Sequence, residues 1–206
     1  MSQPRHRSLG SSRTAGLAWA LALITLLGFG GVGALLIAIG QDRSPMDLIA
    51  GPWAWPGQLA LGAGLGGLVG RLAWAWIAMP AMATARLRYA RLAGIWFPGQ
   101  GMQLVVSVCA GVGEELFFRG ALQHWLGIPA TAVLFVAVHG YLNPNDAGML
   151  RYGAGMVLVF IGLGWLSDTA GLLVPVTAHA VIDAVLLNRL VAAWRAERHP
   201  EGQSCG

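Results

Sequence analysis

The chain has 206 residues, of which 56% are hydrophobic and only 11% are charged, whereas a soluble domain is typically about 25% charged. Together with a mean hydropathy of +0.61, this excludes an ordinary soluble domain and predicts an integral membrane protein. The net charge of +4 does not indicate nucleic-acid binding, because the basic residues, all arginine, flank apolar segments and form no basic surface. The two cysteines provide neither a disulfide framework nor metal-ligand spacing.

The first half of the chain predicts two membrane spans. A polar cytoplasmic tail, residues 1–16, precedes an apolar run at 17–39. That run is too long for a signal peptide's hydrophobic region and lacks a clear cleavage site, so it predicts an uncleaved first span. The second span is expected at 57–79. It carries glycines at four-residue spacing, which let another helix pack closely: Gly62, Gly66 and Gly70.

Arginines in this half leave two alternatives open. Arg71 lies within the second span, where it either extends to the nearer membrane surface or reaches an internal carboxylate. Residues 80–98 mix three arginines with leucine, tyrosine and tryptophan. This composition fits either an amphipathic helix on an anionic membrane surface or a basic loop.

The second half predicts four more spans, separated by turn residues at 143–146 and 167–168. The arginines concentrate in segments on the side of the N-terminus, and the opposite loops hold only Arg43. Arginine-rich loops stay in the cytoplasm. We therefore expect an all-α polytopic membrane helix bundle of about six spans with both termini cytoplasmic. The four later spans are expected at 100–124, 128–141, 152–166 and 172–191.

The expected organisation is a tail at 1–16, N-terminal spans and a basic interfacial segment at 17–99, a catalytic core at 100–191, and a polar tail at 192–206. The core is singled out by ionisable residues inside its apolar runs. Such residues are rare at bilayer depth, are expected to be paired, and mark functional sites.

The third span carries two adjacent glutamates followed by an arginine. Glu115 and Arg119 are four residues apart with the acid first, the favourable order for a helical ion pair. Glu114 is turned by about 100° from Glu115 around the helix. The two carboxylates therefore cannot share one partner equally. We expect Glu115 to brace the structure through Arg119 and Glu114 to be free for chemistry.

Three further ionisable groups lie at similar depth on later spans. His139 is on the fourth, and His179 and Asp183 share one face of the sixth. At about 1.5 Å per residue, they fall with Glu114 near the middle third of an apolar core about 30 Å thick. A carboxylate and two imidazoles can deprotonate water and stabilise an oxyanion. Glu114, His139 and His179 can equally ligate zinc with an open position, although no H-E-x-x-H motif is present.

Taken in order, three motifs resemble the CAAX protease and bacteriocin-processing family of intramembrane glutamic endopeptidases. The resemblance covers about residues 101–190, and the first two spans show no family motif. The motifs are Glu114-Glu115-Leu116-Phe117-Phe118-Arg119, Phe135-Val136-Ala137-Val138-His139 and His179-Ala180-Val181-Ile182-Asp183.

The resemblance implies an all-helical, metal-independent peptidase without a cofactor. By analogy Glu114 activates water with the aid of His139, while His179 and the residue at Asp183 stabilise the oxyanion; the Glu115 and Arg119 pair supports the site. Where the family pattern has asparagine, the aspartate is a departure. An ionised Asp183 cannot donate a hydrogen bond, so it is either protonated or orients His179.

The implied partners are the lipid bilayer and a membrane-embedded or lipid-linked protein substrate, with no nucleic acid. The implied location is the inner, or cell, membrane of a bacterium. Three alternatives stay open: a non-catalytic scaffold or immunity protein of the same fold, a zinc-dependent membrane protease, and a proton-coupled carrier. Buried Glu and His residues also form proton relays, but a carrier usually shows broken helices or paired repeats.

Overall fold

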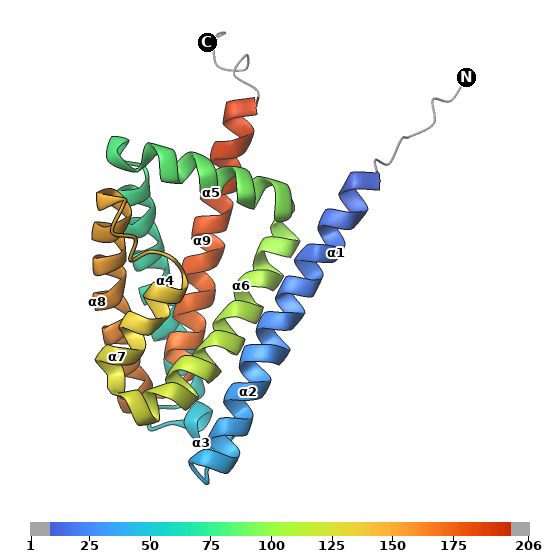
Figure 1. The fold of residues 1–206 in the computed structure, drawn as a ribbon. Coiled ribbons are helices and arrows are strands. Elements are labelled where there is room, and N and C mark those ends of the chain that lie inside the picture. Colours follow the sequence, from blue (N-terminus) through green and yellow to red (C-terminus); the bar gives the residue numbers. More distant parts are fainter. Residues whose placement is uncertain (1–8, 199–206) are drawn as a thin grey trace.

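The computed structural model describes residues 9–198, and every regular element within them is helical (Figure 1). This confirms the all-α fold. The first element is a long rod in which α-helical and wider π-helical turns follow each other without a break. It begins inside the segment expected as a polar tail and ends where the first span was expected to end. The rod consists of α1 (Leu9–Leu23), η1 (Ile24–Phe29), α2 (Gly30–Leu35) and η2 (Leu36–Gly40).

The remaining elements are helices that run along the bundle, the helix α5, which lies across one end of it, and short helical connections (Figure 1). They are α3 (Pro45–Ala50), α4 (Trp55–Ile77), η3 (Pro80–Met82), α5 (Ala83–Trp96), α6 (Gln100–Glu115), η4 (Leu116–Leu122), α7 (Gln123–Val138), α8 (Ala147–Thr169) and α9 (Leu173–Arg198). The helix α9 continues beyond residue 191, into the segment expected as a polar tail.

Within the described residues, 5 helical segments are long and apolar enough to cross a membrane, as in a multi-pass integral membrane protein. The sequence predicted about six, and the difference lies in the 39 residues Gln100–Val138. There the backbone reverses at Gly127, with φ 75° and ψ 167°, just before Pro129. The rest of α7 is too short to span the membrane, which takes about 20 residues. A loop at 139–146 carries the chain onward to α8 (Figure 1).

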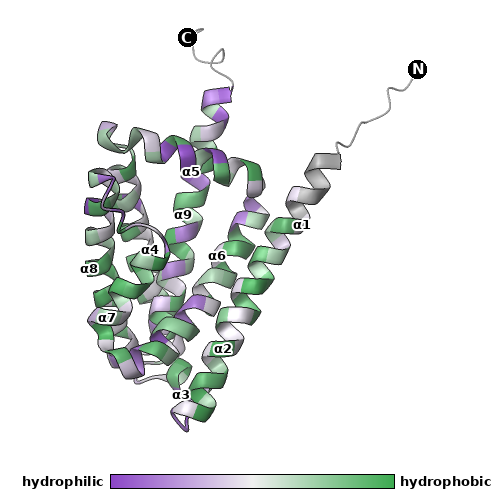
Figure 2. Ribbon diagram, in the orientation of Figure 1, coloured by the Kyte–Doolittle hydropathy of each residue, from purple (hydrophilic) through white to green (hydrophobic). Residues whose placement is uncertain are grey.

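The helix α5 lies across one end of the bundle, on the side where α1 begins and α9 ends (Figure 1). The basic loop is therefore the wrong alternative for residues 80–98, because most of them are helical. The placement of this helix on an anionic membrane surface stays a prediction. Hydrophilic residues are dense along α5, whereas the long helices are mostly apolar (Figure 2). Arg86 fixes α5 to the end of α4, because its Nη1 donates to the carbonyls of Ile77 and Ala78 at 3.1 and 2.7 Å.

The predicted glycine stripe of α4 packs against α9, as expected. Gly62, Gly66 and Gly70 are all buried. A Cβ atom at Gly66 would lie 2.5 Å from the carbonyl oxygen of Ala178, so no larger residue fits without moving α9. Since α9 carries His179, this close contact fixes the position of a candidate site residue.

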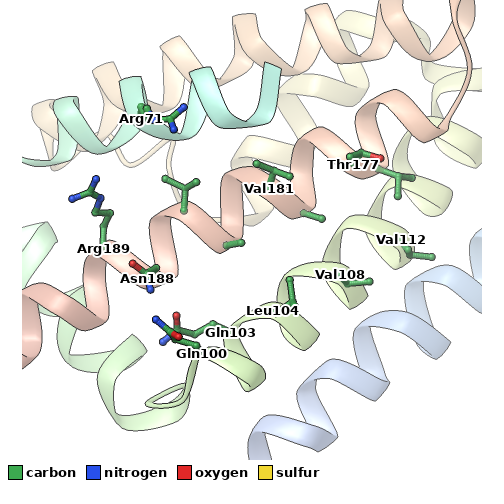
Figure 3. Close-up of a pocket in the computed structure, with 14 residues that line it drawn as sticks. Arg71, Gln100, Gln103, Leu104, Val108, Val112, Thr177, Val181, Asn188 and Arg189 are labelled. Atoms are coloured by element: carbon green, nitrogen blue, oxygen red, sulfur yellow. The ribbon is translucent and has the colours of Figure 1, made fainter. Parts of the chain in front are cut away.

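Arg71 sits on the outer side of this helix pair and is exposed. Its Nη1 donates to the Gly67 carbonyl at 3.3 Å, and none of the carboxylates between residues 9 and 198 forms an ion pair with it. The alternative of an internal carboxylate partner is therefore wrong. Figure 3 shows its head group near Arg189.

The two turns predicted in the second half have different outcomes. Asp146 caps α8, accepting from the backbone N–H groups of Gly148 and Met149 at 3.0 Å, as a turn at 143–146 requires. The turn predicted at 167–168 is wrong, because α8 continues to Thr169. Asp168 instead accepts a hydrogen bond from Gln123 Nε2 at 2.9 Å, which ties α8 to α7.

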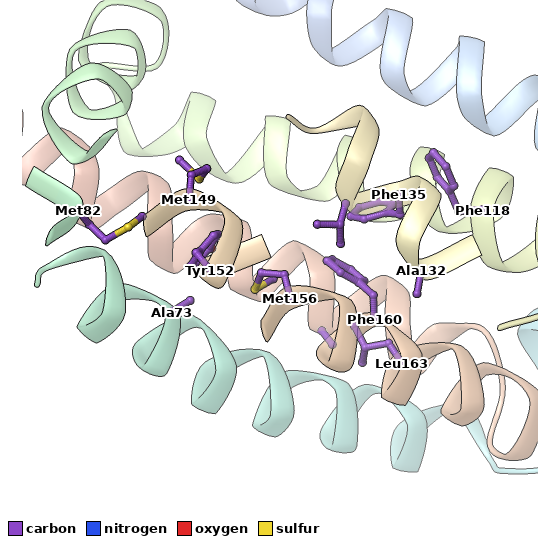
Figure 4. Close-up of a cluster of buried hydrophobic side chains, with 12 residues drawn as sticks. Ala73, Met82, Phe118, Ala132, Phe135, Met149, Tyr152, Met156, Phe160 and Leu163 are labelled. Carbon is purple, nitrogen blue, oxygen red and sulfur yellow. The ribbon is translucent and has the colours of Figure 1, made fainter. Parts of the chain in front are cut away.

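A buried apolar cluster joins α7 and α8 (Figure 4). Two of its rings, Phe135 and Phe160, pack against the ring of His179. Phe135 and Phe160 are its centre, with ring centroids 4.2 Å apart. Its buried members are Ala73, Met82, Phe118, Ala132, Phe135, Val136, Met149, Tyr152, Met156, Phe160, Leu163 and Ala178.

Candidate active site

The two adjacent glutamates at the end of α6 face different partners. Glu114 Oε2 lies 3.3 Å from Nε2 of His139, and the two side chains are 13% and 29% exposed. Glu115 is fully buried and its Oε2 lies 3.2 Å from Nε of Arg119. The separation expected from the helical period is therefore present in the structure.

Arg119 belongs to the π-helical segment η4, a geometry often found at functional sites. Its guanidinium carbon lies 4.4 Å from the ring centroid of Phe135 and 4.6 Å from that of Phe160. Among the described residues its Nη1 and Nη2 have no hydrogen-bond partner. The buried charge is therefore balanced by Glu115 and by the two aromatic faces, in cation–π contacts.

His179 is held on both sides of its ring. Its Nδ1 lies 2.8 Å from Glu115 Oε1, and its Nε2 lies 3.5 Å from Asp183 Oδ2. The contact with Asp183 was expected from their spacing; the shorter contact with Glu115 was not. An imidazole donates to two carboxylates at once only in its cationic form. Glu115 thus bridges Arg119 and His179, and is more than the partner of one arginine.

A glycine on α6 allows this bridge to form. A Cβ atom at Gly111 would lie 2.7 Å from the carbonyl oxygen of Val176 on α9. Small residues are what permit such close contact between membrane helices. The signal for the Glu115–His179 contact was present as a glycine one turn before the glutamates, but it does not say which helix packs there.

His139 is placed by the way α7 ends. Gly140 adopts a left-handed conformation with φ 76°. Its N–H donates to the Ala137 carbonyl at 2.9 Å, and the N–H of Tyr141 donates to the Val136 carbonyl at 3.2 Å. This pair of bonds is a Schellman motif, which ends a helix at the residue before the glycine. His139 is therefore the C-cap residue directly after Val138, with its ring at the helix end.

The ring of His139 is oriented by Phe135, one turn earlier. The two rings stack with centroids 4.3 Å apart and an angle of 29°, and Nδ1 donates to the Phe135 carbonyl at 2.7 Å. This fixes the proton on Nδ1, so Nε2 of a neutral ring is an acceptor. Close contact between that Nε2 and Glu114 then needs one proton between them, on either the imidazole or the carboxyl group.

A cavity of about 590 Å³ brings the four predicted catalytic residues together. It extends from these side chains towards α5, and its other walls come from the N-terminal rod, α8 and the loop after α7. Glu115 and Arg119 do not line it. The polar residues that line it include Glu114, His139, His179 and Asp183, together with Tyr141 and Tyr152.

The zinc alternative required Glu114, His139 and His179 to converge on one point. Across residues 9–198, no three His, Cys, Asp or Glu side chains are arranged to hold a metal ion. The two histidines instead contact different carboxylates, Glu114 and Glu115. The absence of a metal requirement stays a prediction.

Comparison with known proteins identifies the part of the chain that contains this site. Residues 95–185 match the model of the family described as type II CAAX prenyl endopeptidase Rce1-like. The segment is similar to this family, and residues 95–185 are called the Rce1-like segment below. The resemblance seen in the three motifs is thereby confirmed, and all six expected site residues lie within the matched range.

A curated relative matches about half of the chain. The uncharacterized protein YpbD of Bacillus subtilis (strain 168) is 28% identical over 99 residues, which are 48% of this chain and 51% of YpbD. The chain thus spans about half the length of the relative it matches. No solved structure matches the chain. The N-terminal rod and α4 lie outside the Rce1-like segment.

Proposed function

We propose that the protein is an intramembrane endopeptidase that uses Glu114 to activate water. The observation that supports this most directly is the contrast between the two glutamates. Glu114 lines the cavity beside His139, whereas Glu115 is sealed between Arg119 and His179. A structural scaffold has no need of a carboxylate–imidazole pair on a cavity wall, where its desolvation is unfavourable. The Rce1-like match is with a family of endopeptidases.

In the proposed reaction, Glu114 accepts a proton from a water molecule as the water oxygen bonds to the carbonyl carbon of the scissile peptide. His139 holds Glu114 in place and shares the proton between Nε2 and the carboxylate. The carbonyl oxygen becomes an oxyanion, and the cationic ring of His179 stabilises it. The C–N bond then breaks, and the proton passes from Glu114 to the leaving nitrogen.

Asp183 acts in this scheme through His179. It is 3.5 Å from Nε2, a loose contact, and its side chain is 33% exposed towards the cavity. As a carboxylate it keeps the imidazole cationic without donating to the oxyanion. Glu115, which is itself paired with Arg119, orients the His179 ring by its contact with Nδ1.

The substrate we propose is a membrane-embedded or lipid-linked protein. The cavity is largely apolar and extends from the site towards α5, so an apolar peptide or lipid chain can lie along it. If the arginine-rich side is cytoplasmic, the start of α1 and the end of α9 face the cytoplasm, and the cavity leads to the site from that side. We place the protein in the inner, or cell, membrane of a bacterium, with no cofactor and no nucleic-acid partner.

The test is cleavage of membrane peptides by the purified full-length protein. Two substrate sets are compared: peptides with a prenylated C-terminal cysteine, and transmembrane peptides without a lipid. Wild type is expected to cleave one set and Glu114→Gln neither. Activity lost to a chelator and restored by zinc would favour the zinc alternative. If wild type cleaves nothing, a scaffold is favoured, and proton flux in liposomes would point to a carrier.

A further inference from the structure

The cavity lined by Glu114 and His139 is named the reaction cavity. A second cavity lies on the other side of α6 and α9 from it. Its volume is about 750 Å³, and it is walled by α4, α6 and α9 (Figure 3). On α9, His179, Ile182 and Asp183 line the reaction cavity. The groove is lined by residues on the other face of the same helix, among them Ala180, Val181 and Ala184. The two cavities share no lining residue. What binds here is therefore a separate matter from the proposed reaction.

The groove is polar at one end and apolar along its length. At the polar end, the side chains of Arg71, Arg189, Gln100 and Asn188 come from three helices and gather around one space (Figure 3). The rest of the groove is lined by aliphatic side chains, among them Leu104, Val108, Val112 and Val181. This is the shape and polarity of a site for an amphiphile.

The polar end is cationic and its charge is not neutralised by the protein. Arg71 and Arg189 are both exposed, and neither forms an ion pair with a carboxylate between residues 9 and 198. Arg71 donates only to a backbone carbonyl on its own helix. The amides of Gln100 and Asn188 add neutral donors. Two arginines and two amides around one space favour a phosphate group.

The polar end also lies at the depth of a lipid headgroup. Gln100 is the first residue of α6. Arg189 precedes Leu190 and Val191, which pack against Ala90 and Ala93 of α5. The polar end is therefore level with the helix that lies across the arginine-rich end of the bundle, and the apolar part runs from there into the membrane.

We propose that this groove is a binding site for one anionic phospholipid of the arginine-rich leaflet. The lipid phosphate contacts Arg71 and Arg189, and an acyl chain lies along Leu104, Val108 and Val181. Anionic lipids are attracted by basic residues near the membrane surface. A lipid bound in the groove contacts α4, α6 and α9 on the side of the bundle opposite the reaction cavity.

The test is native mass spectrometry of the full-length protein in detergent, titrated with dioleoyl-phosphatidylglycerol or dioleoyl-phosphatidylcholine. Wild type is expected to bind the anionic lipid more tightly. The double variant Arg71→Gln/Arg189→Gln is expected to lose about 30-fold in its affinity for phosphatidylglycerol, because each arginine near the surface contributes about 1 kcal/mol. The matched control is Arg88→Gln/Arg91→Gln, which removes two exposed arginines of α5 outside the groove and is expected to keep wild-type affinity.

Three results would overturn the proposal: no preference in wild type, an equal loss in the control, or displacement of the lipid by millimolar inorganic phosphate, which would indicate a site for a free anion. A second variant tests the groove without altering charge. Val108→Trp fills its apolar part, since Val108 is 46% exposed there. It is expected to weaken binding of the dioleoyl lipid but not of a dihexanoyl lipid with the same headgroup. Unchanged dioleoyl binding in this variant contradicts the acyl-chain assignment.

Discussion

Glu114 and Glu115 are adjacent in the chain, but their carboxylates differ in burial and in their partners. Glu115 is closed off from the cavity, with Arg119 and His179 at ion-pair distance. Glu114 lines the cavity, with one imidazole at 3.3 Å. Two cationic partners fix the position of the buried Glu115 carboxylate. The Glu114 carboxylate has a single partner and lies beside a cavity, where a ligand can reach it. One residue step around a helix is enough to give two adjacent carboxylates different partners and different access to the cavity.

The largest expected effect comes from Glu114→Gln. The amide has nearly the same shape but cannot accept the proton from water, so peptide cleavage is expected to fall by about 10³-fold or more. The measurement is the initial cleavage rate, with the melting temperature as the control for folding. If Glu114→Gln keeps wild-type activity, Glu114 has no catalytic role, and the proposed difference in function between the two glutamates is wrong.

Glu115→Gln is expected to act on stability. It leaves Arg119 buried without its carboxylate, which typically destabilises a protein by about 3–5 kcal/mol. Thermal unfolding in detergent is expected to show a clear drop for this variant and none for Glu114→Gln. If both variants melt like wild type, Glu115 is not the support that its burial indicates.

His139→Ala is expected to reduce cleavage by about 10²-fold, because the proton partner of Glu114 is lost while Glu114 itself remains. His124→Ala is the matched control. His124 packs only against Trp125 among the described aromatic rings, and its loss is expected to change the rate by no more than about twofold. An equal effect of the two substitutions contradicts the role of His139.

The smallest effect is expected for Asp183→Asn. The amide oxygen can still accept from His179 Nε2, so activity is expected to stay within about tenfold of wild type. Asp183→Leu, which removes the acceptor, is expected to lose more. The ratio of their cleavage rates measures how far Asp183 acts by orienting His179; equal rates for the two variants contradict an orienting role.

Helical periodicity accounts for what could be predicted from the sequence. The separation of Glu114 from Glu115, the Glu115–Arg119 pair and the shared face of His179 and Asp183 all depend on neighbours within one helix, and each is present in the structure. The resemblance in motifs also located the Rce1-like segment. The glycine stripe of α4 was expected to pack closely, although not against a named helix.

Contacts between helices far apart in the chain could not be predicted. The bond from His179 to Glu115 joins residues 64 positions apart and depends on how closely α6 approaches α9. The turn expected at 167–168 failed for a similar reason, because Gln123 satisfies Asp168 from another helix and lets α8 continue. The reversal at Gly127 lies between the third and fourth spans as expected, at 100–124 and 128–141. The sequence did not show that the helix after it, which ends at Val138, is too short to cross the membrane.

That reversal has a consequence for hydration. Because α7 restarts after Gly127 and ends at Val138, the non-helical loop at 139–146 begins part-way along the bundle. Non-helical backbone is tolerated within a membrane only where protein covers it or water reaches it. Hydrolysis consumes a water molecule for each bond broken, and lipid cannot supply one. The short helix places non-helical backbone directly after Val138, beside His139. Under the proposed function, we expect water to reach Glu114 along this stretch.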